Sequence, residues 1–159
     1  MNMRIKLMTP EEWPIYQSRI VAFAVRYGDR RLTAAALKRL RQLEPSALVP
    51  VPAEETPSSA IIVALQDGKL TGFAFAEGAG EKTCIVVTHP DSRGLGIASQ
   101  LLLRLRSYFG RLSCRVASDN AASMAACFNA GMIAVGLSPG PTGKPTLRFE
   151  TPDSIPAKS

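Results

Sequence analysis

The sequence is poor in the residues that build metal and redox centres. Histidine occurs once, as His89, and the three cysteines, Cys84, Cys114 and Cys127, are widely spaced and form no Cys-x-x-Cys pair. A histidine-rich metal site is therefore excluded, and the spacing of a zinc site or of a redox motif is missing. We expect no metal, and the cysteine pattern favours a reduced, cytoplasmic setting.

Long apolar runs are missing as well. None approaches the roughly 18–20 residues that a membrane-spanning helix needs, and residues 1–6 show no apolar core of the kind found in a signal peptide. We therefore expect a cytoplasmic protein with no membrane partner. The apolar fraction of 46% and the charged fraction of 20% are ordinary for a globular chain, and 159 residues suffice for one domain.

Negative charge is in short supply, with 13 Asp and Glu residues against 19 Lys and Arg residues, so the net charge is +6. This excess favours an anionic partner, either nucleic acid or a phosphorylated small molecule. The densest basic group, Lys38, Arg39 and Arg41, falls on a predicted helix and is more typical of a solvated face than of a nucleic-acid stripe. Nucleic acid is therefore the less favoured partner.

The first third of the chain has the pattern of two helices and a long loop. Thr9, Pro10 and Glu12 form a helix-start signal. Apolar residues then recur at spacings of three and four, at Trp13, Tyr16, Ile20, Phe23 and Tyr27. A second helix is predicted over 32–43. The prolines of 44–59 favour a loop that is either functional or poorly ordered, and the sequence does not separate the two.

The rest of the chain alternates between strands and helices. Residues 60–65 and 70–77 flank Asp67-Gly68, a strong hairpin signal, and 84–88 follow as a third strand. Next come a helix from Ile97, a strand over 112–117, a helix over 121–130, and strands over 132–137 and 146–149. This order predicts an α/β fold with a sheet of mixed direction. Residues 1–150 are expected to form one domain and 151–159 a flexible tail.

A glycine-containing loop joins the strand ending at Thr88 to the helix beginning at Ile97. The free N–H groups and the positive dipole end of a helix start make a ready anion site. Gly94 and Gly96 let the backbone approach an anion without a Cβ in the way, and Arg93 adds a positive charge. The loop would accommodate a pyrophosphate.

Two familiar phosphate loops fit this segment poorly. A P-loop is excluded, because no Gly-Lys-Ser/Thr follows the first glycine. A dinucleotide fingerprint, Gly-x-Gly-x-x-Gly/Ala, would place its first glycine directly at the strand end. Here five residues separate the strand from Gly94, and Ser99 stands where the fingerprint has its last Gly or Ala. Asp119 does end the next strand, as a ribose-binding acid might, so this alternative stays open although few residues remain for a second half-fold.

The same loop resembles that of a known family. Arg93-x-x-Gly96-x-Ala98 is similar to the Gln/Arg-x-x-Gly-x-Gly/Ala signature of the GNAT superfamily of N-acetyltransferases, and Thr88-His89-Pro90 is similar to its Val-x-Pro lead-in. Downstream, Asn120 to Ser123, then Cys127, then Gly131-Met132 follow the Asn-x-x-Ala/Ser, Tyr and Gly-Phe pattern of the family at the same spacing. The likeness covers nearly the whole chain.

The resemblance implies a fold, a cofactor and a set of binding residues. The fold is a single α/β domain whose mixed, mostly antiparallel central sheet contains two splayed parallel strands and is flanked by helices. Acetyl-CoA is the implied cosubstrate, and Asn120 is expected to contact its pantetheine arm. The backbone of the loop is expected to bind the pyrophosphate, through Arg93, Gly94, Leu95, Gly96, Ile97 and Ala98. The strand edge is expected to bind the pantetheine arm and the acyl carbonyl, through Val86, Val87 and Thr88.

The catalytic groups are less clear. Many members of the family use a Tyr as general acid, and its place is held here by Cys127, the candidate catalytic residue. A thiol is acidic enough for the task, but it is shorter than a phenol and is commonly buried as a small apolar residue. Some members carry a Glu base where Lys82 stands, and the adjacent Glu81 would face the opposite side of the strand.

The resemblance therefore implies an acetyl-CoA-dependent N-acetyltransferase that acts on a primary amine by direct transfer. The acceptor is a small-molecule or peptide amine, and the oligomeric state stays open, a homodimer included. One alternative is a degenerate member that binds acyl-CoA without turnover, motivated by Cys127 and the absent Glu. A second is a basic nucleic-acid-binding module.

Overall fold

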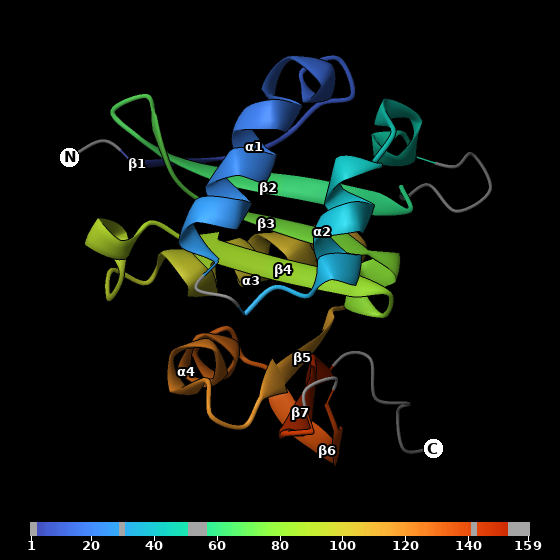
Figure 1. Ribbon diagram of the computed structural model, residues 1–159, viewed down its shortest axis with the longest axis vertical. Coiled ribbons are helices and arrows are strands. Elements are labelled where there is room, and N and C mark those ends of the chain that lie inside the picture. Colours follow the sequence, from blue (N-terminus) through green and yellow to red (C-terminus); the bar gives the residue numbers. More distant parts are fainter. Residues whose placement is uncertain (1–2, 29–30, 51–56, 141–142, 153–159) are drawn as a thin grey trace.

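A computed structural model of the protein describes residues 3–28, 31–50, 57–140 and 143–152. Its helices and strands form two sheets with helices packed around them (Figure 1). In chain order the elements are β1 (Met3–Leu7), α1 (Trp13–Tyr27), α2 (Ala34–Arg41), the 3-10 helix η1 (Pro45–Leu48), β2 (Ser59–Gln66), β3 (Lys69–Glu77), η2 (Gly78–Gly80), β4 (Thr83–Thr88), η3 (Pro90–Ser92), α3 (Ile97–Phe109), β5 (Ser113–Ala117), α4 (Ala121–Asn129), β6 (Ile133–Pro139) and β7 (Pro145–Glu150). The α/β class predicted from the sequence is confirmed.

The two sheets part between β4 and β5. One sheet has the strand order β1-β2-β3-β4 and the other the order β5-β7-β6, and every hydrogen-bonded pair in the described ranges is antiparallel. Strands β4 and β5 are therefore edge strands of different sheets, yet they lie next to each other. The expected splaying falls at this place, and the mostly antiparallel sheet is confirmed.

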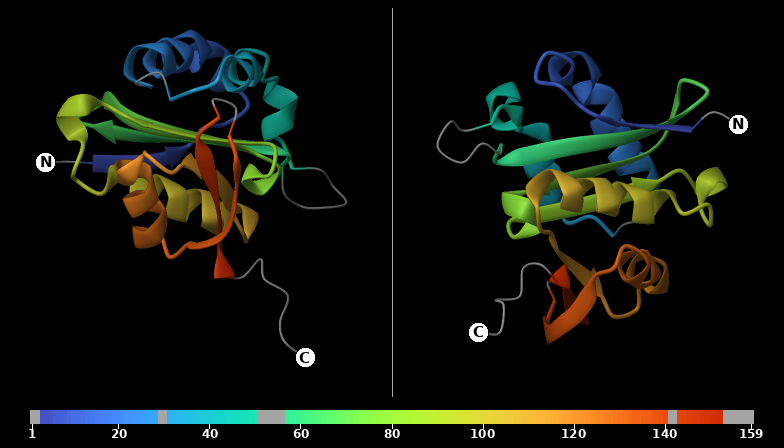
Figure 2. Two further views of the ribbon diagram at one scale, coloured as in Figure 1. Left: turned by 60° about the horizontal axis from the view of Figure 1, so that its bottom comes forward. Right: turned by 180° about the vertical axis from the view of Figure 1, so that it is seen from behind.

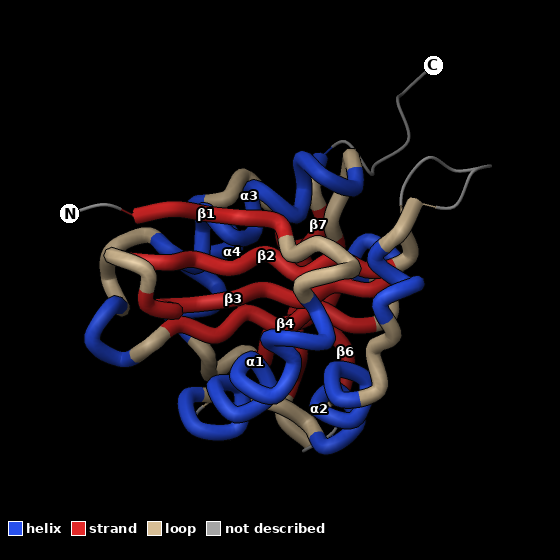
Figure 3. Tube along the Cα trace, turned by 90° about the horizontal axis from the view of Figure 1, so that it is seen from above, coloured by secondary structure: helices blue, strands red, loops and turns tan. Residues whose placement is uncertain are grey.

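Helices cover both faces of the larger sheet (Figures 2 and 3). Helices α1 and α2 lie on one face and α3 crosses the other. Side chains alternate between these faces along a strand. On β3, Phe73 and Phe75 join the core under α1 and α2, while Ala74 and Ala76 join the core under α3. Small residues on the second face let α3 approach the sheet closely, and a Cβ on Gly72 would lie 3.2 Å from a side-chain methyl of Ile97.

The start of α1 follows the predicted capping chemistry. The Glu12 amide donates to the Thr9 hydroxyl at 3.1 Å, and the Thr9 amide donates to the Glu12 carboxylate at 3.0 Å, which is a capping box. Regular helix begins at Trp13. The buried Trp13 indole donates to the carbonyl of Leu43 at 2.8 Å, so α1 is fixed to the segment that follows α2.

Strand β1 was not predicted. It pairs antiparallel with β2, with Met3 opposite Gln66 and Leu7 opposite Ile62. Its five residues alternate apolar and basic, as half-buried strands do, but so short a run beside a strong helix-start signal carries little weight. The hairpin at Asp67-Gly68 is confirmed: both residues have positive φ, as a type I′ turn requires.

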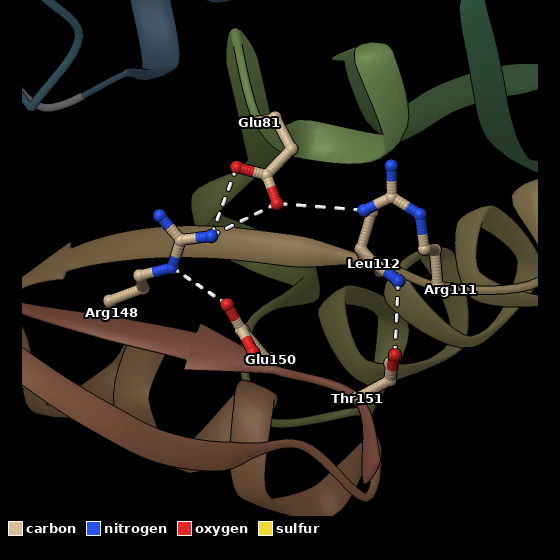
Figure 4. A network of polar contacts seen from close by, with 6 residues as sticks. All are labelled: Glu81, Arg111, Leu112, Arg148, Glu150 and Thr151. Atoms are coloured by element: carbon tan, nitrogen blue, oxygen red, sulfur yellow. Dashed lines mark hydrogen bonds and ion pairs between the residues drawn. The ribbon is translucent and has the colours of Figure 1, made fainter. Parts of the chain in front are cut away.

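Polar contacts join the second sheet to the rest of the molecule (Figure 4). Arg148 of β7 donates to both carboxylate oxygens of Glu81 at 2.9 and 3.0 Å, and Arg111 reaches the same carboxylate at 3.5 Å. The Thr151 amide donates to the Leu112 carbonyl, and the Leu112 amide donates to the Thr151 hydroxyl. The buried Thr151 therefore belongs to the packed structure although the tail was expected from residue 151.

Other expectations fall partly outside the described residues. Within the proline-rich loop, η1 buries Leu48, whereas residues 51–56 are not described, and the same holds for 153–159 of the tail. In the basic group on α2, Arg39 is paired with Glu77, as suits a solvated face. Among the described helices, none combines the length and the apolar character that crossing a membrane requires.

Candidate functional site

A cavity of about 690 Å³ lies where three segments meet. They are the C-terminal end of α1 with the residues after it, the loop that joins β4 to α3, and the start of α4. Figure 1 shows α4 below the edge strand β4, with the lower end of α1 in front of the sheet. The larger sheet thus supplies one wall and the helix starts supply another.

The start of α3 opens onto this cavity. Gly96 is the N-cap residue, and because it has no side chain it makes no capping hydrogen bond with the first turn of the helix. The amides of this first turn have no carbonyl partner within the helix, so they are donors available to an anion. The feature on which the predicted pyrophosphate site depended, an uncovered helix start, is therefore present.

The two glycines of the loop are required by their backbone conformation. Gly94 has φ +80° and Gly96 has φ +78°, and a Cβ added to either would meet no atom within 4 Å. Residues with a Cβ are strained at such φ values. Of the six predicted loop residues, Leu95 alone does not line the cavity, and its side chain is 57% exposed.

Arg93 holds the loop against α1. Its guanidinium donates to the carbonyl of Tyr27 at 3.3 Å, and both residues line the cavity. The Tyr27 ring in turn lies 4.5 Å from the ring of His89. Arg93 therefore places a positive charge beside the helix start while it fixes the position of the loop.

The predicted strand-edge residues also line the cavity. Val86, Val87 and Thr88 all contribute to its wall. Strand β4 pairs with β3 on one side and is the last strand of its sheet, so its other edge faces the region of the cavity. Val87 packs into the core under α1, whereas Val86 and Thr88 alternate to the opposite face.

Asn120 both caps α4 and lines the cavity. Its side-chain oxygen accepts from the Ser123 amide at 3.2 Å, which makes it the N-cap of α4. It also lines the cavity. Because the oxygen is used for capping, the amide nitrogen is the group with which Asn120 would donate to a ligand.

A second, smaller cavity of about 140 Å³ continues between β4 and β5. Arg31, Leu32, Val86, Asn120, Ser123 and Ala126 line both cavities. Asn120, Ser123 and Cys127 share this wall because spacings of three and four residues place them on one face of α4. Phe128, the next residue of α4, is 57% exposed, with its ring against Phe149.

Cys127 is buried at the inner end of the small cavity. Its side chain is 1% exposed and belongs to the core under α3. A hydrogen bond with Cys114 and burial both raise the pKa of the Cys127 thiol well above its ordinary value. A raised pKa weakens the thiol as a proton donor, which favours the packing role over the acid role.

Glu81 and Lys82, which precede β4, and His89, which follows it, offer no general base to the cavities. Glu81 is turned to Arg148, as Figure 4 shows, and Lys82 is exposed. The His89 side chain accepts from the Asp91 amide at 3.1 Å through Nδ1 and caps η3. None of the three lines either cavity in the part of the chain that the structure describes.

An ion-pair cluster at the cavity was missed. Arg31, which follows α1, donates to Asp119 at 2.8 Å, and Lys144 donates to the other oxygen of that carboxylate at 2.6 Å. Hydrogen bonds from Lys144 and Arg31 lower the pKa of Asp119 to about 2. The sequence noted Asp119 only as an acid at a strand end, and nothing in it links residues 88 positions apart.

Comparison with known proteins agrees with this geometry. Residues 57–128, which hold the loop, Asn120 and Cys127, match the family model of the acetyltransferase (GNAT) domain. No curated protein sequence is similar enough to the chain to be counted as a relative.

Solved structures share the fold at low sequence identity. A complex of AAC(6')-Ib with ribostamycin and coenzyme A has 17% identity and a TM-score of 0.61, over 95% of this chain and 93% of that one. A GNAT-family acetyltransferase from Bacillus cereus ATCC 10987 has 15% identity and a TM-score of 0.66, over 95% and 97%. A spermidine N-acetyltransferase SpeG chimera from Vibrio cholerae and hSSAT has 12% identity and a TM-score of 0.66, over 97% of both chains. The segment that builds the site is thus similar to the acetyltransferase (GNAT) domain, and the fold of the whole chain is similar to that of solved acetyltransferases.

Proposed function

We propose that this protein transfers an acetyl group from acetyl-CoA to a primary amine by direct attack of the amine on the thioester. One observation carries the proposal: the uncapped start of α3 opens onto a cavity that continues into the cleft between β4 and β5. An extended cofactor with a diphosphate at one end and a narrow arm at the other matches a site of this shape. Acetyl-CoA has that form.

The diphosphate binds at the loop. Backbone amides from Arg93 to Ala98 donate to its oxygens, and the helix dipole and the Arg93 guanidinium add favourable charge. The net charge of +6 also suits so anionic a ligand. In this arrangement, sequence-independent backbone contacts supply most of the phosphate recognition.

The pantetheine arm runs along the outer edge of β4. Its amides form hydrogen bonds with the backbone of Val86 to Thr88, much as an added strand would. The Asn120 amide group donates from the other wall, at the opening of the small cavity. The thioester is thereby held where the two sheets part.

Positioning supplies much of the rate. Holding two reactants in a productive orientation is worth effective molarities of about 10⁵ M or more. The buried Cys127 thiol with its raised pKa is assigned to packing, and water takes the proton of the amine and returns one to the leaving thiolate. Cys127 stands where the family motif places its Tyr acid, but we assign the proton transfers to water.

The acceptor is a small-molecule or peptide amine. One similar structure holds ribostamycin and another is a spermidine N-acetyltransferase chimera. Both compounds are amines, which supports an amine acceptor here. The acceptor side is formed by α1, α2 and the residues between them, which reach the cavity through Tyr27, Arg31 and Leu32. We place the reaction in the cytoplasm, which suits the free thiols of the chain.

The test separates binding from turnover. Thermal denaturation with CoA, acetyl-CoA and longer acyl-CoAs should show stabilisation, because ligands of the native state raise its stability. CoA release is then measured against a panel of primary amines that includes aminoglycosides, polyamines, amino acids and peptides. Stabilisation with turnover on at least one amine supports the proposal, and the absence of any stabilisation by CoA contradicts it.

A second candidate function is acyl-CoA binding without catalysis. Two observations favour this candidate. The Cys127 thiol is buried with a raised pKa, and the Glu81 carboxylate is bound to Arg148, so neither residue supplies an acid or a base to the cleft. Binding with no CoA release on any acceptor would select this candidate. Affinity for RNA that survives loss of CoA binding and falls steeply with salt would instead indicate a nucleic-acid module.

A further inference from the structure

All three cysteines of the chain meet at the small cavity between the sheets. Cys84 comes from β4, Cys114 from β5 and Cys127 from α4, at sequence separations that gave no hint of proximity. Each lines the cavity of about 140 Å³, and each is a free thiol. No described group of three His, Cys, Asp or Glu side chains is arranged to hold a metal ion.

Cys114 is the central member of the cluster. It lines the same small cavity as Cys84 and Cys127 and belongs to the core cluster that holds Cys127 and against which Cys84 packs. The neighbouring thiols lower the pKa of Cys114, whereas the Cys114 thiol and burial raise the pKa of Cys84 and of Cys127. Because the thiolate is the reactive form of cysteine, Cys114 is the nucleophile of the group.

Solvent exposure and position in the fold distinguish the two possible disulfide partners of Cys114. Cys127 is 1% exposed and lies in the core, while Cys84 is only partly buried and lines the small cavity together with Cys114 of the neighbouring edge strand. A small oxidant reaches Cys114 through the cavity that it lines, and Cys84 in the same wall can act as the resolving thiol, which is the arrangement of a redox-sensitive cysteine. The Cys84–Cys114 pair meets these conditions.

We propose that Cys84 and Cys114 form a reversible disulfide that joins β4 to β5 and closes the cofactor cleft. The oxidant is a hydroperoxide such as hydrogen peroxide. The Cys114 thiolate attacks one peroxide oxygen, forming a sulfenic acid, and the released hydroxide leaves as water with the proton of the thiol. The Cys84 thiol then attacks the sulfenic sulfur and a second water leaves. Two thiols lose two electrons and two protons, and one hydrogen peroxide becomes two waters.

The consequence for activity rests on the proposed function. The pantetheine arm of acetyl-CoA needs β4 and β5 to stand apart, with the edge of β4 exposed along Val86 to Thr88. A covalent bond between the strands fixes their separation at the inner end of this path. Oxidation therefore excludes the cofactor, and a bound cofactor shields the thiols from the oxidant.

The test combines bond mapping with binding. The full-length protein is treated with hydrogen peroxide, and peptide mapping by mass spectrometry is expected to find Cys84 linked to Cys114, with the mass lower by two hydrogens. Acetyl-CoA affinity, measured by calorimetry, is expected to fall by about tenfold or more and to return with dithiothreitol. Acetyl-CoA added first is expected to slow the formation of the disulfide.

Variants identify the pair. Each variant is compared with its own reduced form: C84S and C114S should lose the response to peroxide, while C127S should keep it. Should C114S fail to fold, C84S tests the same bond from the other strand. A Cys114–Cys127 disulfide, no disulfide at all, or a Cys84–Cys114 disulfide that leaves affinity unchanged would overturn the proposal. Failure of the reduced protein to bind acetyl-CoA would overturn the proposed function, while bond mapping would still decide whether the disulfide forms.

Discussion

A negative charge placed at the start of α3 should abolish cofactor binding without unfolding the protein. Gly96→Asp introduces a side chain at φ +78°, where nothing within 4 Å of the added Cβ obstructs it. The cost to folding is then the strain of a non-glycine residue in the left-handed region, about 1 kcal/mol. Native domains have a stability of roughly 5–15 kcal/mol, so the fold survives.

The effect on binding is larger. At ~4 Å, two like charges near a protein surface repel by about 4 kcal/mol at an effective dielectric constant of about 20, which corresponds to a loss of affinity of about a thousandfold. Gly96→Ala is the matched control, because it carries the same backbone strain without charge, and we expect it to lose about tenfold or less.

Calorimetric titration with acetyl-CoA measures both variants, and thermal denaturation measures the strain. If Gly96→Asp bound as tightly as the unaltered protein, the diphosphate would not lie at this helix start. If Gly96→Ala lost as much affinity as Gly96→Asp, charge repulsion would be the wrong explanation. Equal thermal stability of the two variants would confirm that they share the same backbone strain.

Three further outcomes are expected. Cys127→Ala should leave turnover nearly unchanged because the thiol is a packing group, and steady-state kinetics showing a drop of about a hundredfold or more would make it the general acid. The folded state lowers the pKa of Asp119, so its ion pairs contribute fully to folding stability above the ordinary pKa of 3.8, and this contribution is lost as the pH falls to about 2. An NMR titration of Asp119 with a midpoint near 3.8 would show that the pairs are absent in solution. Trp13→Phe leaves the Leu43 carbonyl without its donor and should cost about 2 kcal/mol in chemical denaturation, whereas no measurable loss would mean that this bond adds nothing to stability.

Local signals predicted most of the fold. The Thr9–Glu12 capping box, the Asp67-Gly68 turn and the glycine loop each act over a few residues, and each has the structure that its chemistry requires. Strand β1 was missed because its stability comes from pairing with β2, a partner more than fifty residues away, rather than from its own five residues. Residues 51–56 and 153–159 lie outside the described part of the chain.

The candidate site likewise contains residues that local motifs predict and contacts that only the packing of distant segments creates. The loop residues and Asn120 belong to motifs with fixed spacing, and all of them except Leu95 line one cavity. The Arg31–Asp119 pair and the meeting of Cys84 with Cys114 depend on how α1, β4 and β5 come together. No pattern within one element encodes such contacts, which is why they appear only in three dimensions.

The central claim is that main-chain donors at the start of α3 hold the diphosphate of coenzyme A. Amide nitrogen and proton shifts, followed by NMR during titration with CoA, test it most directly. We predict that the amides of Gly94, Gly96, Ile97 and Ala98 show the largest shifts and saturate together with the binding curve. Binding that leaves those amides unmoved, with the large shifts elsewhere in the chain, would contradict the claim.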